Sequence, residues 1–307
     1  MRRRDLLGSM AAAAAVLTAS GASAGAAPPP PSGRRRDIVT DDGTRLHYRD
    51  WGSGRPIVLV APWALSSRWW DYHLAALGAS GFRCVAFDRR GHGRSDEPGG
   101  GYDFDTLADD LATVIGTLDL RDVLLVGHSM GAAEVVRYLA RHRARRVTQA
   151  ALVATITPLI ARTPDNPDGA AAEVFERARQ GLMRDRAGTV ASAAAVFFGA
   201  PTNTVAPAVL ESWTRSIVDG CSLKVMLDLH RAMTTTDFRP DLRAIAVPTL
   251  LVHGDADASA RLALTSRPTH ALIKGSTLTI YEGAAHGLVV THADRLHQDL
   301  LAFAAAR

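Results

Sequence analysis

Residues 127–131 read GHSMG, and they lie between an apolar run, VLLV at 123–126, and a helix-like stretch at 130–142. A serine flanked two positions away by glycines is typical of a sharp turn from a strand into a helix. Gly127 and Gly131 would let neighbouring backbone approach closely. The helix beginning near Met130 would direct its free N–H groups at the place where an oxyanion forms. The pattern therefore predicts that Ser129 is a nucleophile.

Short apolar runs alternate with helical patterns on both sides of this serine. This alternation predicts an α/β fold with a mostly parallel central sheet and helices on both faces. Alternation of polar and apolar residues around Asp42-Gly43 predicts a hairpin before the first buried strand. The alternation of strands and helices stops over about 156–246, which is mostly helix-like. We expect this stretch to be an inserted helical cap at the carboxyl ends of the strands. The runs read as strands are 56–61, 82–88, 122–127, 147–155, 247–255 and 276–283.

A serine nucleophile needs a base to take its proton and an acid to orient that base. After the strand-like run at 247–255, the sequence HGDAD offers two acids, Asp255 and Asp257. After the run at 276–283, EGAAHG offers His286 on a glycine-bounded loop. Each candidate follows a predicted strand, so all would meet Ser129 at one edge of the sheet. The order serine, aspartate, histidine is that of hydrolases with this kind of turn.

The other histidines have structural interpretations. We expect His128 to point away from the site, His92 to brace its loop and His253 to end a buried strand. His, Cys and carboxylate residues show no metal-ligand spacing, and no glycine-rich phosphate or dinucleotide fingerprint follows the first strand. The sequence thus predicts neither a metal nor a cofactor. The two cysteines, Cys84 and Cys221, lie far apart in the sequence, which is weak evidence for a disulfide.

Charge is modest, with a formal net value of +4 and no basic stripe interleaved with aromatic residues, so we expect no nucleic-acid partner. The N-terminus has a cationic start, an apolar segment and a small-residue site ending at Ala24. This arrangement predicts a signal peptide over 1–24, of twin-arginine type because of Arg3-Arg4. A proline-rich linker would follow at 25–34. The apolar segment is too short to span a bilayer, so we expect no membrane span in the mature protein. We expect bacterial export by the twin-arginine machinery to the periplasm or the exterior.

From about Arg35 to its end, the chain resembles the α/β-hydrolase superfamily, and within it the cofactor-free bacterial haloperoxidase or perhydrolase esterases. This resemblance implies that Ser129 is the nucleophile, Asp257 the acid and His286 the base. It also implies that the backbone N–H groups of Trp63 and Met130 form the oxyanion hole. The stretches that carry it are FDRRGHGRSD, LVGHSMGAAEVVRYLARH, TPDNPDG, TDFRPDL, VPTLLVHGDAD and YEGAAHGLVVTHADRLHQDLLAF.

Two segments depart from the family pattern. Ala61-Pro62 precede Trp63 where relatives usually carry His-Gly. The sequence DASARLAL at 257–264 stands where relatives usually carry an apolar segment that contains proline. Proline lacks an N–H, but the donor required belongs to Trp63. The implied activity is hydrolysis of a small carboxylic ester or acyl substrate through an acyl-enzyme, with a perhydrolase side activity that needs no metal. The alternatives are a catalytically silent binding protein of this fold, or a hydrolase of lactones or other acyl compounds.

The export signal gives the first testable prediction. Replacing both Arg3 and Arg4 with Lys should leave the precursor in the cytoplasm with its signal attached, because the twin-arginine pair is the recognised feature. Fractionation of the expressing cells, with immunoblotting for precursor and mature forms, measures this. Normal export of the double variant would point instead to the general secretion route.

Overall fold

The computed structural model of the 307-residue chain describes residues 37–200, 203 and 205–306. The chain divides into two units, Met1–Arg34 and Arg35–Arg307. The predicted signal peptide and proline-rich linker lie outside the described residues. All of the described helices and strands belong to the second unit.

One eight-stranded sheet organises the described residues, in the order β1-β2-β4-β3-β5-β6-β7-β8. The first two strands form the predicted hairpin, with Val39 opposite Arg45, and β2 also runs antiparallel to β4. All other neighbours are parallel. The predicted α/β architecture is therefore confirmed. The strands are β1 (Asp37–Val39), β2 (Arg45–Gly52), β3 (Pro56–Val60), β4 (Arg83–Phe87), β5 (Val123–His128), β6 (Val147–Val153), β7 (Thr249–Gly254) and β8 (Thr277–Tyr281).

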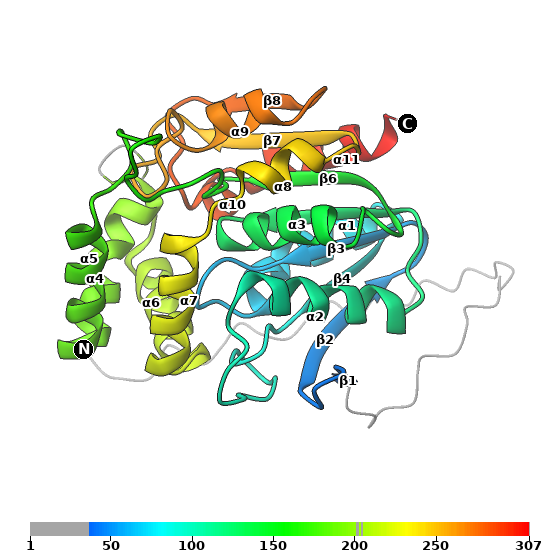
Figure 1. Ribbon diagram of the computed structural model, residues 1–307. Helices are drawn as coiled ribbons and strands as arrows, with labels where there is room; N and C mark the ends of the chain where they lie inside the picture. Colours follow the sequence, from blue (N-terminus) through cyan, green and yellow to red (C-terminus); the bar gives the residue numbers. More distant parts are fainter. Residues whose placement is uncertain (1–36, 201–202, 204, 307) are drawn as a thin grey trace, which may run out of the picture. The chain divides into compact units, whose positions relative to one another are not determined.

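Alternation along the buried strands builds a separate apolar core on each face of the sheet. In β3, Ile57 and Leu59 join the core under α1 (Asp71–Ala79) and α11 (Ala293–Ala305). Val58 and Val60 join the larger core under α2 (Phe104–Thr117) and α3 (Met130–Arg141). Every residue of β3 is buried, because helices cover both faces (Figure 1). These helices are α1 (Asp71–Ala79), preceded by the 3-10 turn η1 (Ser67–Trp70), and α2 (Phe104–Thr117), α3 (Met130–Arg141), α8 (Arg239–Ala244), α9 (Ser266–Leu272), α10 (Leu288–Thr291) and α11 (Ala293–Ala305).

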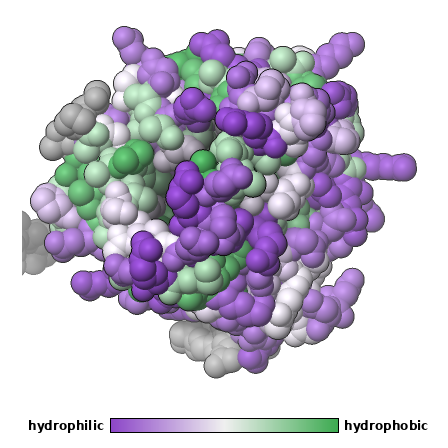
Figure 2. Space-filling view, turned by 60° about the vertical axis from the view of Figure 1, so that its left-hand side comes forward, coloured by the Kyte–Doolittle hydropathy of each residue, from purple (hydrophilic) through white to green (hydrophobic). Residues whose placement is uncertain are grey.

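Four helices between β6 and β7 form the cap. They are α4 (Ala172–Arg184), α5 (Arg186–Phe198), α6 (Pro207–Gly220) and α7 (Leu223–Thr235), and they gather at one end of the sheet in Figure 1. Helix α8 lies within the predicted cap limits but packs against α3, where Leu242 is fully buried in the main core. The view that brings this side forward shows apolar surface around a hollow, facing a mainly hydrophilic half (Figure 2).

Two further features of the described residues bear on the sequence predictions. Cys84 and Cys221 are both buried and both free thiols. No helix among residues 37–200, 203 and 205–306 combines the length and apolar character needed to cross a bilayer.

Candidate active site

Ser129 sits in a strained turn between β5 and α3. Its backbone has φ 55° and ψ −116°, a region that residues with a side chain rarely adopt, at a cost of about 1–3 kcal/mol. Such a turn reverses the chain so abruptly that α3 begins at the next residue, Met130. The serine is 7% exposed, so the turn presents its hydroxyl in a nearly closed site rather than to bulk water.

The two glycines of the turn have the close approaches that the sequence predicts. A Cβ added at Gly131 would lie 2.4 Å from the carbonyl oxygen of Val60 at the end of β3. One added at Gly127 would lie 2.4 Å from the carbonyl oxygen of Gly131 itself. Both distances are far below van der Waals contact, so a side chain at either position would displace backbone and open the turn.

A continuous hydrogen-bonded chain joins Ser129, His286 and Asp257. The Ser129 Oγ lies 2.8 Å from His286 Nε2, and His286 Nδ1 lies 2.6 Å from Asp257 Oδ2. Asp257 follows β7 and His286 follows β8, so both reach the serine from the carboxyl ends of parallel strands. Asp257 is 3% exposed and His286 4% exposed. The three residues singled out in the sequence thus meet in one buried cluster.

The two candidate acids, Asp255 and Asp257, have different surroundings in the structure. Asp255 is exposed, and its Oδ1 accepts a hydrogen bond from the Gly283 N–H, 2.7 Å away. Asp257 points inward, and its second oxygen, Oδ1, accepts from the backbone N–H groups of Ser259 and Ala260, both at 2.8 Å. The segment that departs from the family pattern therefore seats the carboxylate through its backbone rather than through its side chains.

Asp257 stays ionised in spite of its burial. Burial alone opposes ionisation, but the charge that His286 can carry and hydrogen bonds from His253 and His286 outweigh it, so the pKa of the Asp257 carboxyl lies well below its ordinary value. An ionised carboxylate at this position fixes the imidazole tautomer and stabilises the imidazolium that forms when the base takes a proton.

His253 is a partner of Asp257 that the sequence interpretation missed. Its Nε2 lies 3.2 Å from Asp257 Oδ2 and 2.7 Å from the Ala260 carbonyl oxygen, and its Nδ1 lies 2.7 Å from Ser266 Oγ. The prediction that His253 merely ends a strand is incomplete, because the ring supports the acid. The only sequence signal is its position four residues before Asp257, which becomes informative only when the loop geometry is known.

Trp63 and Met130, the predicted oxyanion donors, stand on the loop after β3 and at the start of α3. Within the described part of the chain, neither backbone N–H donates to a protein acceptor. The Trp63 indole donates to the Met226 carbonyl oxygen of α7 at 3.1 Å, which ties this loop to the cap. Their assignment as oxyanion donors rests on the family resemblance and stays a prediction.

A buried ion pair braces the Ala61-Pro62 segment. The Arg89 guanidinium donates to the Ala61 carbonyl oxygen at 2.8 Å and to the Pro62 carbonyl oxygen at 3.5 Å, while its Nε donates to Glu134 Oε2 at 2.7 Å. Both side chains are almost fully buried, and burial raises the pKa of Glu134 to about 7. The Arg89 guanidinium thus holds the carbonyl groups of Ala61 and Pro62 in place. The Pro62 carbonyl and the Trp63 N–H belong to one planar peptide bond, so the direction of this carbonyl also sets the direction of the N–H.

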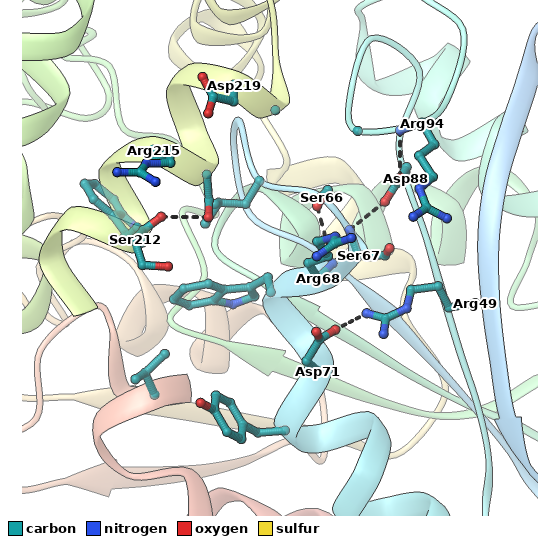
Figure 3. Close-up of a pocket in the computed structure, with 18 of the residues that line it drawn as sticks. Arg49, Ser66, Ser67, Arg68, Asp71, Asp88, Arg94, Ser212, Arg215 and Asp219 are labelled. Atoms are coloured by element: carbon teal, nitrogen blue, oxygen red, sulfur yellow. Dashed lines mark hydrogen bonds and ion pairs between the residues drawn. The ribbon is translucent and has the colours of Figure 1, made fainter. Parts of the chain in front are cut away.

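A groove of about 1000 Å³ lies between α6 and the segment from Ser66 to Asp71. Figure 3 shows Ser212, Arg215 and Asp219 of α6 on one side, and Arg68 and the Arg49–Asp71 ion pair on the other. Neither Ser129 nor His286 lines this groove, but Trp69 does. The indole of Trp69 also donates to the buried His128, at 3.0 Å, so it contacts both the groove and the interior.

No group of three or more His, Cys, Asp or Glu side chains is placed to hold a metal ion within residues 37–200, 203 and 205–306. The chemistry that the arrangement itself supports is acyl transfer, since it combines a hydroxyl, a hydrogen-bonded base and an ionised acid.

Comparisons with known proteins agree with this geometry. Residues 55–293 match the family described as alpha/beta hydrolase fold. The chain is 42% identical over 269 residues to a non-heme haloperoxidase of Rhodococcus erythropolis, covering 87% of this chain and 98% of the relative. It is 36% identical to the bifunctional esterase/perhydrolase DCH of Acinetobacter calcoaceticus, covering 87% and 98% of the two chains.

A solved structure shares the whole architecture. The crystal structure of bromoperoxidase from Bacillus anthracis superimposes with a TM-score of 0.82 at 33% sequence identity. The match covers 87% of this chain and 98% of the bromoperoxidase.

The different surroundings of the two acids give a prediction for ester substrates. Asp257→Asn should lower kcat by about 10⁴-fold, because an amide favours the wrong imidazole tautomer. Asp255→Asn should have little effect, because an amide oxygen still accepts from Gly283. Steady-state kinetics with a chromogenic acetate ester measures both. Equal losses, or a larger loss at Asp255, would contradict the assignment of the acid.

Proposed function

The chain belongs to the α/β-hydrolase fold family, and we propose that it is a serine hydrolase that cleaves carboxylic esters through an acyl-enzyme. The observation that carries the proposal is the unbroken hydrogen-bonded chain from Ser129 through His286 to Asp257. The names of its relatives, a non-heme haloperoxidase and a bifunctional esterase/perhydrolase, support the same reaction class.

Acylation begins when His286 Nε2 removes the proton from Ser129 Oγ as that oxygen attacks the ester carbonyl. The developing oxyanion would accept hydrogen bonds from the N–H groups of Met130 and Trp63. His286 then gives the proton to the leaving alcohol, and an ester of Ser129 remains. Asp257 stabilises the transient imidazolium throughout, while its second oxygen stays bound to the loop backbone.

Deacylation repeats these steps with another nucleophile. Water, deprotonated by His286, attacks the acyl-enzyme and releases the carboxylic acid, with the proton returned to Ser129. Hydrogen peroxide in place of water releases a peracid, and the peracid oxidises a halide while reverting to the carboxylic acid. We propose that this perhydrolysis is a side activity of the same acyl-enzyme, so it needs peroxide and a carboxylic acid or ester but no metal.

A catalytically silent protein of this fold is the competing interpretation, since the Ala61-Pro62 segment departs from the usual pattern. Two observations weigh against silence. The reacting groups lie at hydrogen-bonding distances, and Arg89 holds both carbonyls of the altered segment. A strained serine, and a buried ionised carboxylate hydrogen-bonded to a histidine, are features that cluster at active sites and that ligand binding alone does not require.

We also propose that the enzyme acts after export, in the periplasm or outside the cell. The support is the twin-arginine pair and the small-residue site ending at Ala24.

The coupled action of base and nucleophile gives a sharp prediction. Ser129→Ala should lower ester hydrolysis by about 10⁵- to 10⁶-fold, and His286→Ala by a similar factor, because each needs the other. The double variant should lose little more than either single one. Rates with a chromogenic acetate ester, at matched folding by circular dichroism, measure this. Losses that multiply in the double variant would contradict a coupled triad.

Perhydrolysis gives a separate prediction. Halide oxidation should require peroxide and a short carboxylic acid such as acetate, persist with a metal chelator, and vanish in Ser129→Ala. The variant with Ala61→His and Pro62→Gly should alter the ratio of perhydrolysis to hydrolysis, because a misplaced oxyanion donor costs about 10²-fold. A halide-oxidation assay run beside ester hydrolysis gives this ratio. Halogenation that survives loss of the serine would show chemistry outside the acyl-enzyme.

A further inference from the structure

We propose that His128 and Trp69 are positioning residues that hold the loop carrying His286 against Ser129. This inference rests on the proposed function, because it assigns a role relative to the catalytic base. Neither residue touches the reacting atoms; both act through the backbone of His286.

Two hydrogen bonds of ordinary length define this support. His128 is fully buried, and its Nε2 lies 3.0 Å from the carbonyl oxygen of His286. On the other side of the ring, the Trp69 indole Nε1 lies 3.0 Å from His128 Nδ1. The two rings are nearly parallel, with planes 10° apart and centroids 5.5 Å apart. The sequence interpretation, which gave His128 no part in the site, missed this contact.

These partners leave His128 one protonation state. An indole N–H can only donate, so His128 Nδ1 must accept. A backbone carbonyl can only accept, so His128 Nε2 must carry the hydrogen. The ring is therefore the neutral Nε2–H tautomer with both nitrogens satisfied. A second proton would place two N–H groups face to face.

A fixed neutral His128 also protects the proton affinity of the base. The His128 and His286 rings have centroids 5.1 Å apart, and a charge on one would oppose a charge on the other. Burial lowers the pKa of His128 well below its usual range, in agreement with its hydrogen bonds. The proton released by Ser129 therefore has one acceptor in the cluster, His286, which Asp257 supports.

The cap holds the same peptide unit from the other side. The His286 carbonyl and the Gly287 N–H belong to one peptide bond, and the Gly287 N–H donates to the Phe197 carbonyl oxygen of α5 at 2.7 Å. The Phe197 ring also meets the His286 ring edge-on, with centroids 5.2 Å apart. Both polar groups of this peptide are therefore held, one by the turn before Ser129 and one by the cap.

The covalent neighbourhood of His128 explains why this contact positions the base. His128 precedes Ser129 directly, so the turn that places the nucleophile also places the donor to the His286 carbonyl. His286 lies in a loop, five residues beyond the end of β8. Contacts from outside this loop are needed to keep its Nε2 at 2.8 Å from Ser129 Oγ. An error of about 1 Å in such a distance can cost about 10²-fold in rate.

Two pairs of variants test the inference. Trp69→Phe removes the donated indole N–H but keeps an aromatic ring. Trp70→Phe is its matched control, because the buried Trp70 Nε1 has no hydrogen-bond partner among the described residues, while its ring also meets His128 edge-on. His128→Leu removes both hydrogen bonds, whereas His128→Gln keeps one acceptor and one donor at similar reach.

The first readout is the rate at which a fluorophosphonate labels the active serine, which needs no knowledge of the natural substrate. We expect Trp69→Phe to slow labelling by about 10-fold, the equivalent of one lost hydrogen bond. His128→Leu should slow it by about 10²-fold. Trp70→Phe should label like the wild type, and His128→Gln should recover most of the loss. For ester hydrolysis, kcat should fall while KM stays unchanged, which a general loss of structure would not produce.

The second readout is the ¹⁵N NMR spectrum of the histidine rings, which is independent of activity. His128 should show the neutral Nε2–H tautomer from pH 5 to 8 in the wild type. An imidazolium or an Nδ1–H tautomer would overturn the inference, even if His128→Leu fails to fold.

The inference would also be overturned if the Trp69→Phe variant were labelled at the wild-type rate, or if Trp70→Phe slowed labelling as much as Trp69→Phe does. Failure of the wild type itself to label or to hydrolyse any ester would instead refute the proposed function.

Discussion

The strained backbone of Ser129 is the constraint on which the rest of the site depends. A residue with a side chain keeps φ 55° with ψ −116° only where its surroundings hold it there, and Ser129 is held between β5 and the start of α3. Gly131 lies so close to Val60 that the helix carrying Met130 is fixed relative to the loop carrying Trp63. One turn thereby sets the position of the proposed nucleophile and the spacing of both proposed oxyanion donors.

Buried charged groups lie on both sides of this turn, and each is held by an oppositely charged or hydrogen-bonded partner. On one side, Asp257 accepts from two backbone N–H groups and faces two histidines, which keeps its carboxylate ionised behind His286. On the other, Arg89 is shared between Glu134 and the carbonyls before Trp63. An unpaired charge at either place would cost several kcal/mol, so each loop is held in one arrangement.

The cap contributes to the site through its backbone. The Phe197 carbonyl of α5 accepts from Gly287, next to the base, and the Met226 carbonyl of α7 accepts from the indole of Trp63. The cap therefore contacts both the loop that carries His286, the proposed base, and the loop that carries Trp63, a proposed oxyanion donor. A change in cap packing would therefore affect both of these loops together, although no cap residue belongs to the proposed triad.

The sequence by itself determined the alternation of strands and helices, the serine turn and the order of Ser129, Asp257 and His286. These follow from local rules: apolar periodicity, the glycines that a tight turn requires, and acids and bases placed just after strands. It left Asp255 and Asp257 open until a family resemblance favoured one, and it missed the contacts that His128, His253 and Arg89 make. Only the tertiary structure decided these, because their partners lie on segments distant in the sequence, and which ring nitrogen or carboxylate oxygen meets which donor depends on how those segments pack.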